Sequence, residues 1–141
     1  TATVANMISR QKAGKAFVTV NAGETLCQPS VVANVATSVP QATHVACAST
    51  GGRILTFELS ELKAQANGGR GLMLIDLEDK DTLAGAAAYT RSIRIEGVGR
   101  GGKARDETLE IRSLNNARAV RARKGKLADL GFKPNKITRV E

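Results

Sequence analysis

A glycine followed by a basic residue recurs along the chain in a form suited to holding phosphate groups. Gly14-Lys15, Gly69-Arg70 and Gly125-Lys126 are separated by 55 and 56 residues. Glycine lets backbone amides approach an anion closely, and the adjacent Lys or Arg supplies a positive charge. The spacing predicts a phosphate-binding loop that is repeated in successive structural units.

The densest basic segment is Arg121-Ala122-Arg123-Lys124-Gly125-Lys126. Its alternative interpretation is an ordinary solvated loop. Because charged side chains beside glycine suit a polyanionic backbone, we expect this segment and the isolated bases near other glycines to contact nucleic acid. The predicted binding residues are Arg10, Lys12, Lys15, Arg70, Arg100, Lys103, Arg121, Arg123, Lys124 and Lys126.

The formal net charge of +8 is concentrated in the last third of the chain. Residues 1–90 contain seven basic and seven acidic residues, whereas residues 91–141 contain 14 basic and six acidic residues. A localised excess favours binding of a polyanion through counterion release, although a basic face can also serve solubility alone. Trp is absent and aromatic residues are few, so duplex backbone recognition fits better than base stacking on single strands.

Other side chains that could do chemistry lack partners in the sequence. Tyr89 could act as a nucleophile, but Ala86-Ala87-Ala88 precede it and no metal-binding acids accompany it. His44 has no evident nucleophile partner. The segment Glu78-Asp79-Lys80-Asp81 has an intervening Lys and lacks the turn spacing of an oxygen-ligand cation site, so we expect a solvated loop. The chain is therefore not expected to hold catalytic residues or a metal.

The elements that position these residues are expected to be strands. Runs rich in Val, Ile, Thr and Leu are bounded by Gly, Asn and Ser, which favours an all-β fold. Thr50-Gly51-Gly52-Arg53 and Gly97 to Gly102 are predicted to be turns, and residues 59–63 and 113–117 to be Ser-capped helical turns. Residues 83–88 fit a strand or a helix, and we prefer a strand. The clearest predicted strands are residues 17–20, 44–48, 54–57, 72–75, 92–95 and 109–111.

Length, composition and the start of the sequence predict a fragment of a cytoplasmic protein, which forms either one domain or a few repeat units of a larger one. No apolar run approaches the roughly 20 residues of a membrane span, no signal segment is recognisable, and the chain opens at Thr1 without Met. Cys27 and Cys47 lie in apolar surroundings without zinc-site spacing, and we expect both to be reduced core thiols.

The repeated loops suggest a propeller-like architecture, because a period of roughly 50 residues with several strands in each unit is typical of such folds. The chain would hold two full units and part of a third, with joins at residues 9–16, 64–71 and 118–126. Chance similarity among Gly-rich loops is the alternative.

Several segments resemble, in order, the C-terminal domain found in the A subunit of topoisomerase IV. Ser9 to Thr19 resembles a join between repeats, and Thr50 to Phe57 with Gly68 to Gly71 resembles the next blade and its join. The segments Leu130-Gly131-Phe132 and Ile137 to Val140 resemble the last blade. The resemblance covers essentially the whole chain through motif order and spacing.

This resemblance implies that residues 1–141 are part of one β-pinwheel domain, built from four-stranded antiparallel blades. It implies that a basic rim binds and bends double-stranded DNA and steers the transported duplex. The implied partners are the remainder of the topoisomerase A subunit, which forms a dimer, and the ATPase of the enzyme, its B subunit, in a heterotetramer. Mg²⁺ and ATP are implied for the parent ATP-dependent type II topoisomerase, and no cofactor for this fragment.

The related gyrase domain carries the basic box Gln-Arg-Arg-Gly-Gly-Lys-Gly, from which this chain departs. Arg100-Gly101-Gly102-Lys103-Ala104 is the nearest match, but it begins 31 residues after Gly69, out of register with the joins. We therefore interpret it as a basic hairpin tip, and expect DNA binding without chiral wrapping. A β-rich RNA- or ribosome-binding module is the alternative function, and an independent enzyme domain is the least supported.

Overall fold

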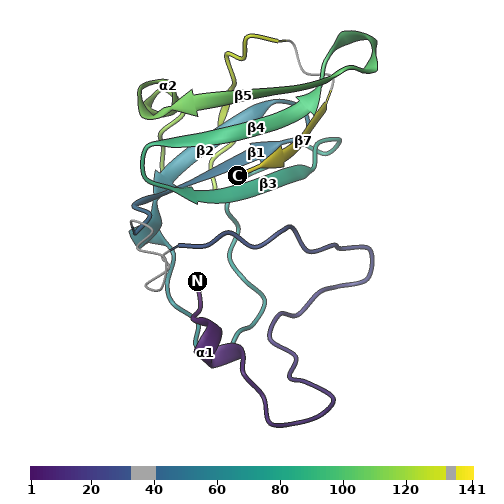
Figure 1. The fold of residues 1–141 in the computed structure, drawn as a ribbon, viewed down its shortest axis with the longest axis vertical. Coiled ribbons are helices and arrows are strands. Elements are labelled where there is room, and N and C mark those ends of the chain that lie inside the picture. Colours follow the sequence, from purple (N-terminus) through teal and green to yellow (C-terminus); the bar gives the residue numbers. More distant parts are fainter. Residues whose placement is uncertain (33–40, 133–135) are drawn as a thin grey trace. The chain divides into compact units, whose positions relative to one another are not determined.

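The computed structural model describes residues 1–32, 41–132 and 136–141, which form two compact units. Unit 1 consists of residues 1–26 and 62–72, and unit 2 of residues 27–61 and 73–141. Figure 1 shows their elements. No helix within the described residues has both the length and the apolarity needed to cross a membrane.

Unit 1 has little regular structure. It contains the short helix α1 (Val4–Met7) and a turn in which the Gly14 amide donates to the Gln11 carbonyl over 2.9 Å. Its two segments meet at an isolated parallel bridge between Val18 and Gly69. All its residues are described, and none is buried. Unit 1 therefore has no hydrophobic core of its own.

Unit 2 contains two antiparallel sheets, which Figure 1 shows stacked on each other. The first sheet has the strand order β3-β1-β2-β6 and the second has β5-β4-β7. Two short 3₁₀ segments, Leu59–Glu61 and Arg100–Gly102, and the helix α2 (Ile111–Asn115) complete it. The strands are β1 (His44–Ser49), β2 (Arg53–Glu58), β3 (Leu83–Tyr89), β4 (Ser92–Val98), β5 (Ala104–Glu110), β6 (Lys126–Leu127) and β7 (Lys136–Val140).

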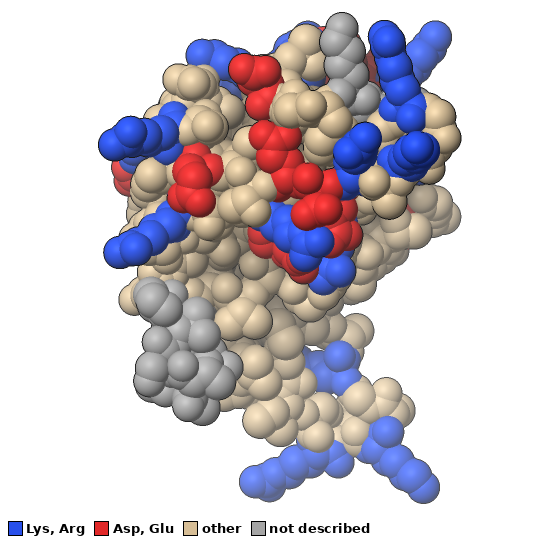
Figure 2. Space-filling view, turned by 45° about the horizontal axis from the view of Figure 1, so that its top comes forward, with Lys and Arg blue, Asp and Glu red and all other residues tan. Residues whose placement is uncertain are grey.

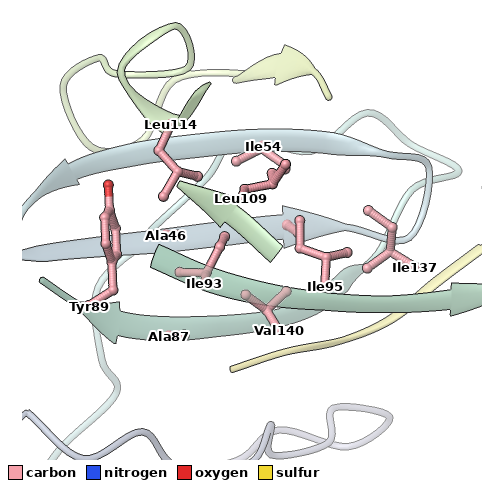
Figure 3. Close-up of a cluster of buried hydrophobic side chains, with 11 residues drawn as sticks. Ala46, Ile54, Ala87, Tyr89, Ile93, Ile95, Leu109, Leu114, Ile137 and Val140 are labelled. Carbon is pink, nitrogen blue, oxygen red and sulfur yellow. The ribbon is translucent and has the colours of Figure 1, made fainter. Parts of the chain in front are cut away.

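The core lies between the two sheets, as Figure 3 shows. Ala46 of β1 and Ala87 of β3 present small side chains, which leave room for Ile93 and Ile95 of β4. Leu114 of α2 closes one end of this cluster. Strand β4 alternates buried and less buried residues, as expected of a strand with one face on a core, whereas β1 and β2 are buried on both faces.

These elements confirm the all-β prediction and most of its strands. Strands β1, β2, β4 and β5 contain the predicted segments, except that Ile111 begins α2, and the ambiguous residues 83–88 form β3. Both predicted turns join hairpins. Residues 17–20 and 72–75 were predicted to be strands, and this is wrong. Val18 forms only the single bridge to Gly69, and residues 72–75 join no ladder, because an apolar run becomes a strand only where a neighbouring segment pairs with it.

Two smaller predictions also need correction. Ser113 does not cap a helix, since α2 begins directly after the extended Glu110 and no side chain caps it. Both cysteines are free, and Cys47 is buried, but Cys27 is exposed because its segment belongs to no sheet or helix. The repeat joins proposed at residues 9–16, 64–71 and 118–126 stay a prediction.

Candidate nucleic-acid interface

Four of the predicted binding residues lie in unit 1, and all are exposed: Arg10, Lys12, Lys15 and Arg70. The Gln11–Gly14 turn separates Lys12 from Lys15. Gly69, directly before Arg70, donates to the Phe17 carbonyl over 3.0 Å. The fold of unit 1 thus brings bases from two predicted joins near one bridge, although they are 55 residues apart in sequence.

The dense segment of residues 121–126 is fixed in unit 2 by backbone hydrogen bonds to residues 73–76. The Ala122 amide donates to the Leu74 carbonyl over 2.9 Å, and the Asp76 amide donates to the Arg123 carbonyl over 3.0 Å. Arg123, Lys124 and Lys126 are exposed. A loop whose backbone is held while its charged side chains face solvent is suited to binding an anion.

Arg121 differs from its neighbours because its backbone amide and its guanidinium each donate to an acceptor within the protein. Its amide donates to the Glu61 carboxylate over 2.9 Å, and its guanidinium donates to the Met73 carbonyl. The side chain is half-buried. Arg121 is therefore placed to hold the loop on unit 2, and its predicted contact with nucleic acid remains a prediction.

Gly125 explains how the basic loop can pass close to β2. Its φ is +69°, and a Cβ at this position would lie 2.6 Å from the Ile54 carbonyl oxygen. Directly after it, Lys126 pairs with Ile54 in the ladder between β6 and β2. The glycine of this join is thus required by close backbone packing, as well as by backbone conformation.

The predicted basic hairpin tip is confirmed in structure. Arg100 and Lys103 are exposed between β4 and β5, beside Gly101 and Gly102, which both have φ of +75°. Figure 1 places this tip at one end of β5 and α2 at the other. Arg100 and Lys103 therefore project from a turn that two long paired strands support.

The strand register brings this tip and Lys126, the last residue of the dense segment, to one end of unit 2. Lys136 of β7 pairs with Val98 beside the β4–β5 tip, and the next amide, of Ile137, donates to the Thr50 carbonyl over 3.1 Å. Thr50 begins the β1–β2 turn, and Leu127 of β6 pairs with Arg53 just after it. We call this end, made of residues 50–53, 98–104, 126–127 and 136, the hairpin end.

Acidic residues neutralise bases elsewhere on unit 2. Arg94 contacts Asp106 at 3.2 Å, and Arg118 forms an ion pair with Glu58. Figure 2 shows Asp and Glu in the middle of one face, with Lys and Arg protruding around them. Among the described residues, none of the predicted binding residues forms a direct ion pair. Their charge is available to a ligand.

The residues considered for catalysis have structural roles in unit 2. Tyr89 is 5% exposed and packs in the core, and burial raises its pKa despite a hydrogen bond with Thr56. The His44 ring lies 5.5 Å from the Tyr89 ring and its Nδ1 is 2.7 Å from the Thr43 hydroxyl. The Tyr89 side chain is therefore enclosed by the core, whereas His44 is only partly buried.

The acidic segment before β3 supports the β1–β2 turn. Asp81 accepts hydrogen bonds from the Gly51 amide at 2.8 Å and the Thr50 hydroxyl at 2.9 Å. Burial alone would raise the pKa of Asp81, but these bonds and those from Ser49 and Thr82 hold it below its ordinary value. Nowhere in residues 1–32, 41–132 and 136–141 do three His, Cys, Asp or Glu form a group that could hold a metal.

Sequence reasoning missed two exposed bases, Lys136 at the hairpin end and Lys80 in the loop before β3. Neither adjoins a glycine, and Lys136 lies ten residues after Lys126 along the chain. Only the pairing of Lys136 with Val98 places it beside the β4–β5 tip. No local sequence signal indicates this neighbourhood.

Comparison with known proteins identifies similar domains. Residues 43–89 match the family model of the DNA gyrase C-terminal domain, a β-propeller. The A subunit of DNA topoisomerase 4 from Neisseria gonorrhoeae is 33% identical over 127 residues, which are 89% of this chain but 16% of that protein.

Solved structures show the same fold. The E. coli ParC C-terminal domain matches with a TM-score of 0.73 and 24% identity over 99% of this chain and 54% of that chain. A C-terminal domain of DNA topoisomerase IV matches with a TM-score of 0.55 and 17% identity, over 71% of this chain and 31% of the other. The chain thus spans about half of the first domain and a small part of the curated relative.

Proposed function

Because the chain belongs to the β-pinwheel family of C-terminal domains from the A subunits of gyrase and topoisomerase IV, we propose that it binds duplex DNA through the phosphate backbone, without reading base sequence. The observation that carries this proposal is the gathering of exposed bases from separate segments at the hairpin end. Lys126 lies on β6, and Arg100 and Lys103 lie at the β4–β5 tip. The pairing of β6 with β2, and of β4 with β5 and β7, holds these residues at the hairpin end. Such charges bind by releasing counterions from DNA.

The composition of the surface favours duplex over single-stranded nucleic acid. Single-strand binding uses exposed aromatic rings on which bases stack. This chain has no Trp, Tyr89 and Phe57 are buried, and Phe17 and Phe132 are only partly exposed. Duplex backbone contact needs only exposed cations and accessible amides, which the basic loops supply.

In the longer enzyme, we propose that this region bends DNA and steers the transported segment during ATP-dependent decatenation and supercoil relaxation. The catalytic groups, with their Mg²⁺ and ATP, come from the remainder of the dimeric A subunit together with the ATPase, which is the B subunit. This region contributes DNA binding and no catalytic group, and the enzyme acts in the cytoplasm. Tyr89 lies in the core and does not serve as the cleaving tyrosine.

The test is the salt dependence of binding to a labelled 20-base-pair duplex. Replacing Arg123, Lys124 and Lys126 by Ala removes up to three phosphate contacts, so the slope of log K against log salt flattens by about 2.7. Arg94→Ala is a control for loss of a single paired charge, because Arg94 already contacts Asp106, Glu96 and Glu141. An unchanged slope in the triple variant would contradict the assignment.

Two further measurements separate the function from its alternative. In competition, a structured RNA that displaces the duplex more effectively than unlabelled DNA does would favour an RNA-binding module instead. Restoring this region to a topoisomerase IV that lacks it should restore decatenation. If decatenation is not restored, the steering role is wrong, and DNA binding is then tested by the salt slopes alone.

A further inference from the structure

A hollow of about 520 Å³ opens at the hairpin end, outside the basic loops that the sequence singled out. The β1–β2 turn, the loop before β3, β6 and the start of β7 border it. Lys80 and Lys136 both line this hollow, and both are exposed. Four segments distant in sequence thus converge around two lysines.

The acidic side chains of the hollow are occupied by the protein itself. Glu78 forms an ion pair with Arg53 at 3.1 Å. Asp81 accepts from the Gly51 amide and the Thr50 hydroxyl. Across the described residues, neither lysine forms an ion pair with an acid. Because the donors to Asp81 are neutral, its negative charge remains and offsets one lysine. The charged side chains that line the hollow therefore sum to one net positive charge, carried by two lysines that form no ion pair.

The surroundings of the hollow suit the backbone of a double helix. Leu127 is 71% exposed at its border and presents an apolar surface of the kind that sugar groups contact. Lys126 precedes it on β6, and Lys136 pairs with Val98 next to the β4–β5 tip. A polyanion lying across the hairpin end would pass from the predicted basic residues to these two lysines.

We propose that Lys80 and Lys136 bind phosphate groups of the duplex that the hairpin-end bases contact, and so extend the interface across β6 to β7. This inference rests on the proposed DNA binding. It assigns the hollow to phosphate, since two unpaired ammonium groups and an exposed turn face it. It also gives the start of β7 a role in binding that the repeated glycine loops do not predict.

The experiment measures binding of the complete 141-residue chain to a labelled 20-base-pair duplex between 50 and 200 mM salt. The K80A/K136A variant should flatten the slope of log K against log salt by about 1.8, and weaken binding about tenfold for each lost contact near 0.1 M salt. The K80R/K136R variant keeps both charges and should bind as the unsubstituted chain does. Thermal unfolding of each variant checks that the fold is intact.

A matched charge loss at the other end of unit 2 supplies the control. Arg91 precedes β4 and Arg112 lies in α2, and both are exposed. Ser92 pairs with Glu110, whereas Val98 pairs with Ala104 at the hairpin end, so a strand of roughly 20 Å separates the two ends. The R91A/R112A variant removes the same net charge and should leave the slope nearly unchanged.

The outcomes distinguish this inference from the function on which it rests. If the unsubstituted chain shows no salt-dependent duplex binding, the proposed function fails, and the phosphate hollow with it. If it binds with a steep slope that K80A/K136A leaves unchanged, DNA binding stands and the hollow is not part of it. If K80A/K136A and R91A/R112A flatten the salt slope equally, the effect comes from net charge and not from the position of the lysines, and the assignment is overturned. Stronger binding to an RNA duplex that depends on these lysines would overturn the choice of DNA.

Discussion

Replacing Gly125 by Ala should destabilise unit 2 far more than the same replacement at another glycine with positive φ. An L-residue in the left-handed region costs about 1–2 kcal/mol. At Gly125, the added Cβ would also lie 2.6 Å from the Ile54 oxygen and 2.9 Å from its carbonyl carbon. Relief of this contact must move β6 away from β2, which costs roughly one ladder hydrogen bond, about 1 kcal/mol. The expected total is about 3 kcal/mol.

Gly101→Ala is the matched control for backbone conformation. Gly101 has φ of +75°, close to the +69° of Gly125, but nothing lies within 4 Å of its added Cβ. Its cost should therefore be about 1 kcal/mol, from conformation alone. A domain of this size loses about 4 °C in Tm for each kcal/mol, so the expected losses are about 12 °C for Gly125→Ala and about 4 °C for Gly101→Ala.

Thermal melts followed by circular dichroism measure both losses under identical conditions. The difference between the two variants isolates the steric contact with Ile54, because the conformational cost is common to both. Equal Tm losses would refute the steric argument and reduce the role of Gly125 to conformation. A small loss at both positions would mean that the basic loop does not pass as close to β2 as the structure places it.

Three further predictions concern single side chains. Ala122, with φ of 62°, should gain up to about 1 kcal/mol of stability as Gly, and a lower Tm in Ala122→Gly would contradict this. Burial, with a contribution from nearby Cys27, raises the pKa of the Cys47 thiol to about 12. At mildly alkaline pH, a thiol reagent should therefore label Cys27 alone until denaturant is added. Rapid labelling of both thiols in the native chain would contradict this prediction. Because the folded pKa of Asp81 lies below 3.8, its stabilising effect is present above that value and lost as pH falls through the folded pKa. The stability gap between the unsubstituted chain and Asp81→Asn should therefore shrink below about pH 4, and a constant gap would exclude this role.

Sequence patterns predicted the strands that find partners within the chain. The hairpins are local, because Thr50 to Arg53 and Gly97 to Gly102 contain residues that favour turns, and the flanking runs pair with each other. Residues 17–20 have equally suitable composition but form one bridge. Whether an apolar segment becomes a strand depends on whether another segment lies beside it and pairs with it, which the sequence of the first segment does not specify.

The candidate interface was only partly predictable for the same reason. The exposed bases at the β4–β5 tip follow from their turn sequence. Arg121 and Arg123 are the same residue type in the same basic segment, yet only Arg121 donates through its backbone amide to Glu61 and through its guanidinium to the Met73 carbonyl. The position of Lys136 depends on the register of β7 against β4, which the sequence does not display.

Strand β7 has a consequence for how the protein is made. Its Ile137 and Val140 fill the core between two hairpins whose own residues emerge from the ribosome much earlier. Ile137 bonds to Thr50, a residue far earlier in the chain. The earlier strands must therefore wait with an open apolar face until β7 has been synthesised. Closure over so long a sequence separation is slow, so this stage of synthesis is when the nascent chain is most exposed to aggregation.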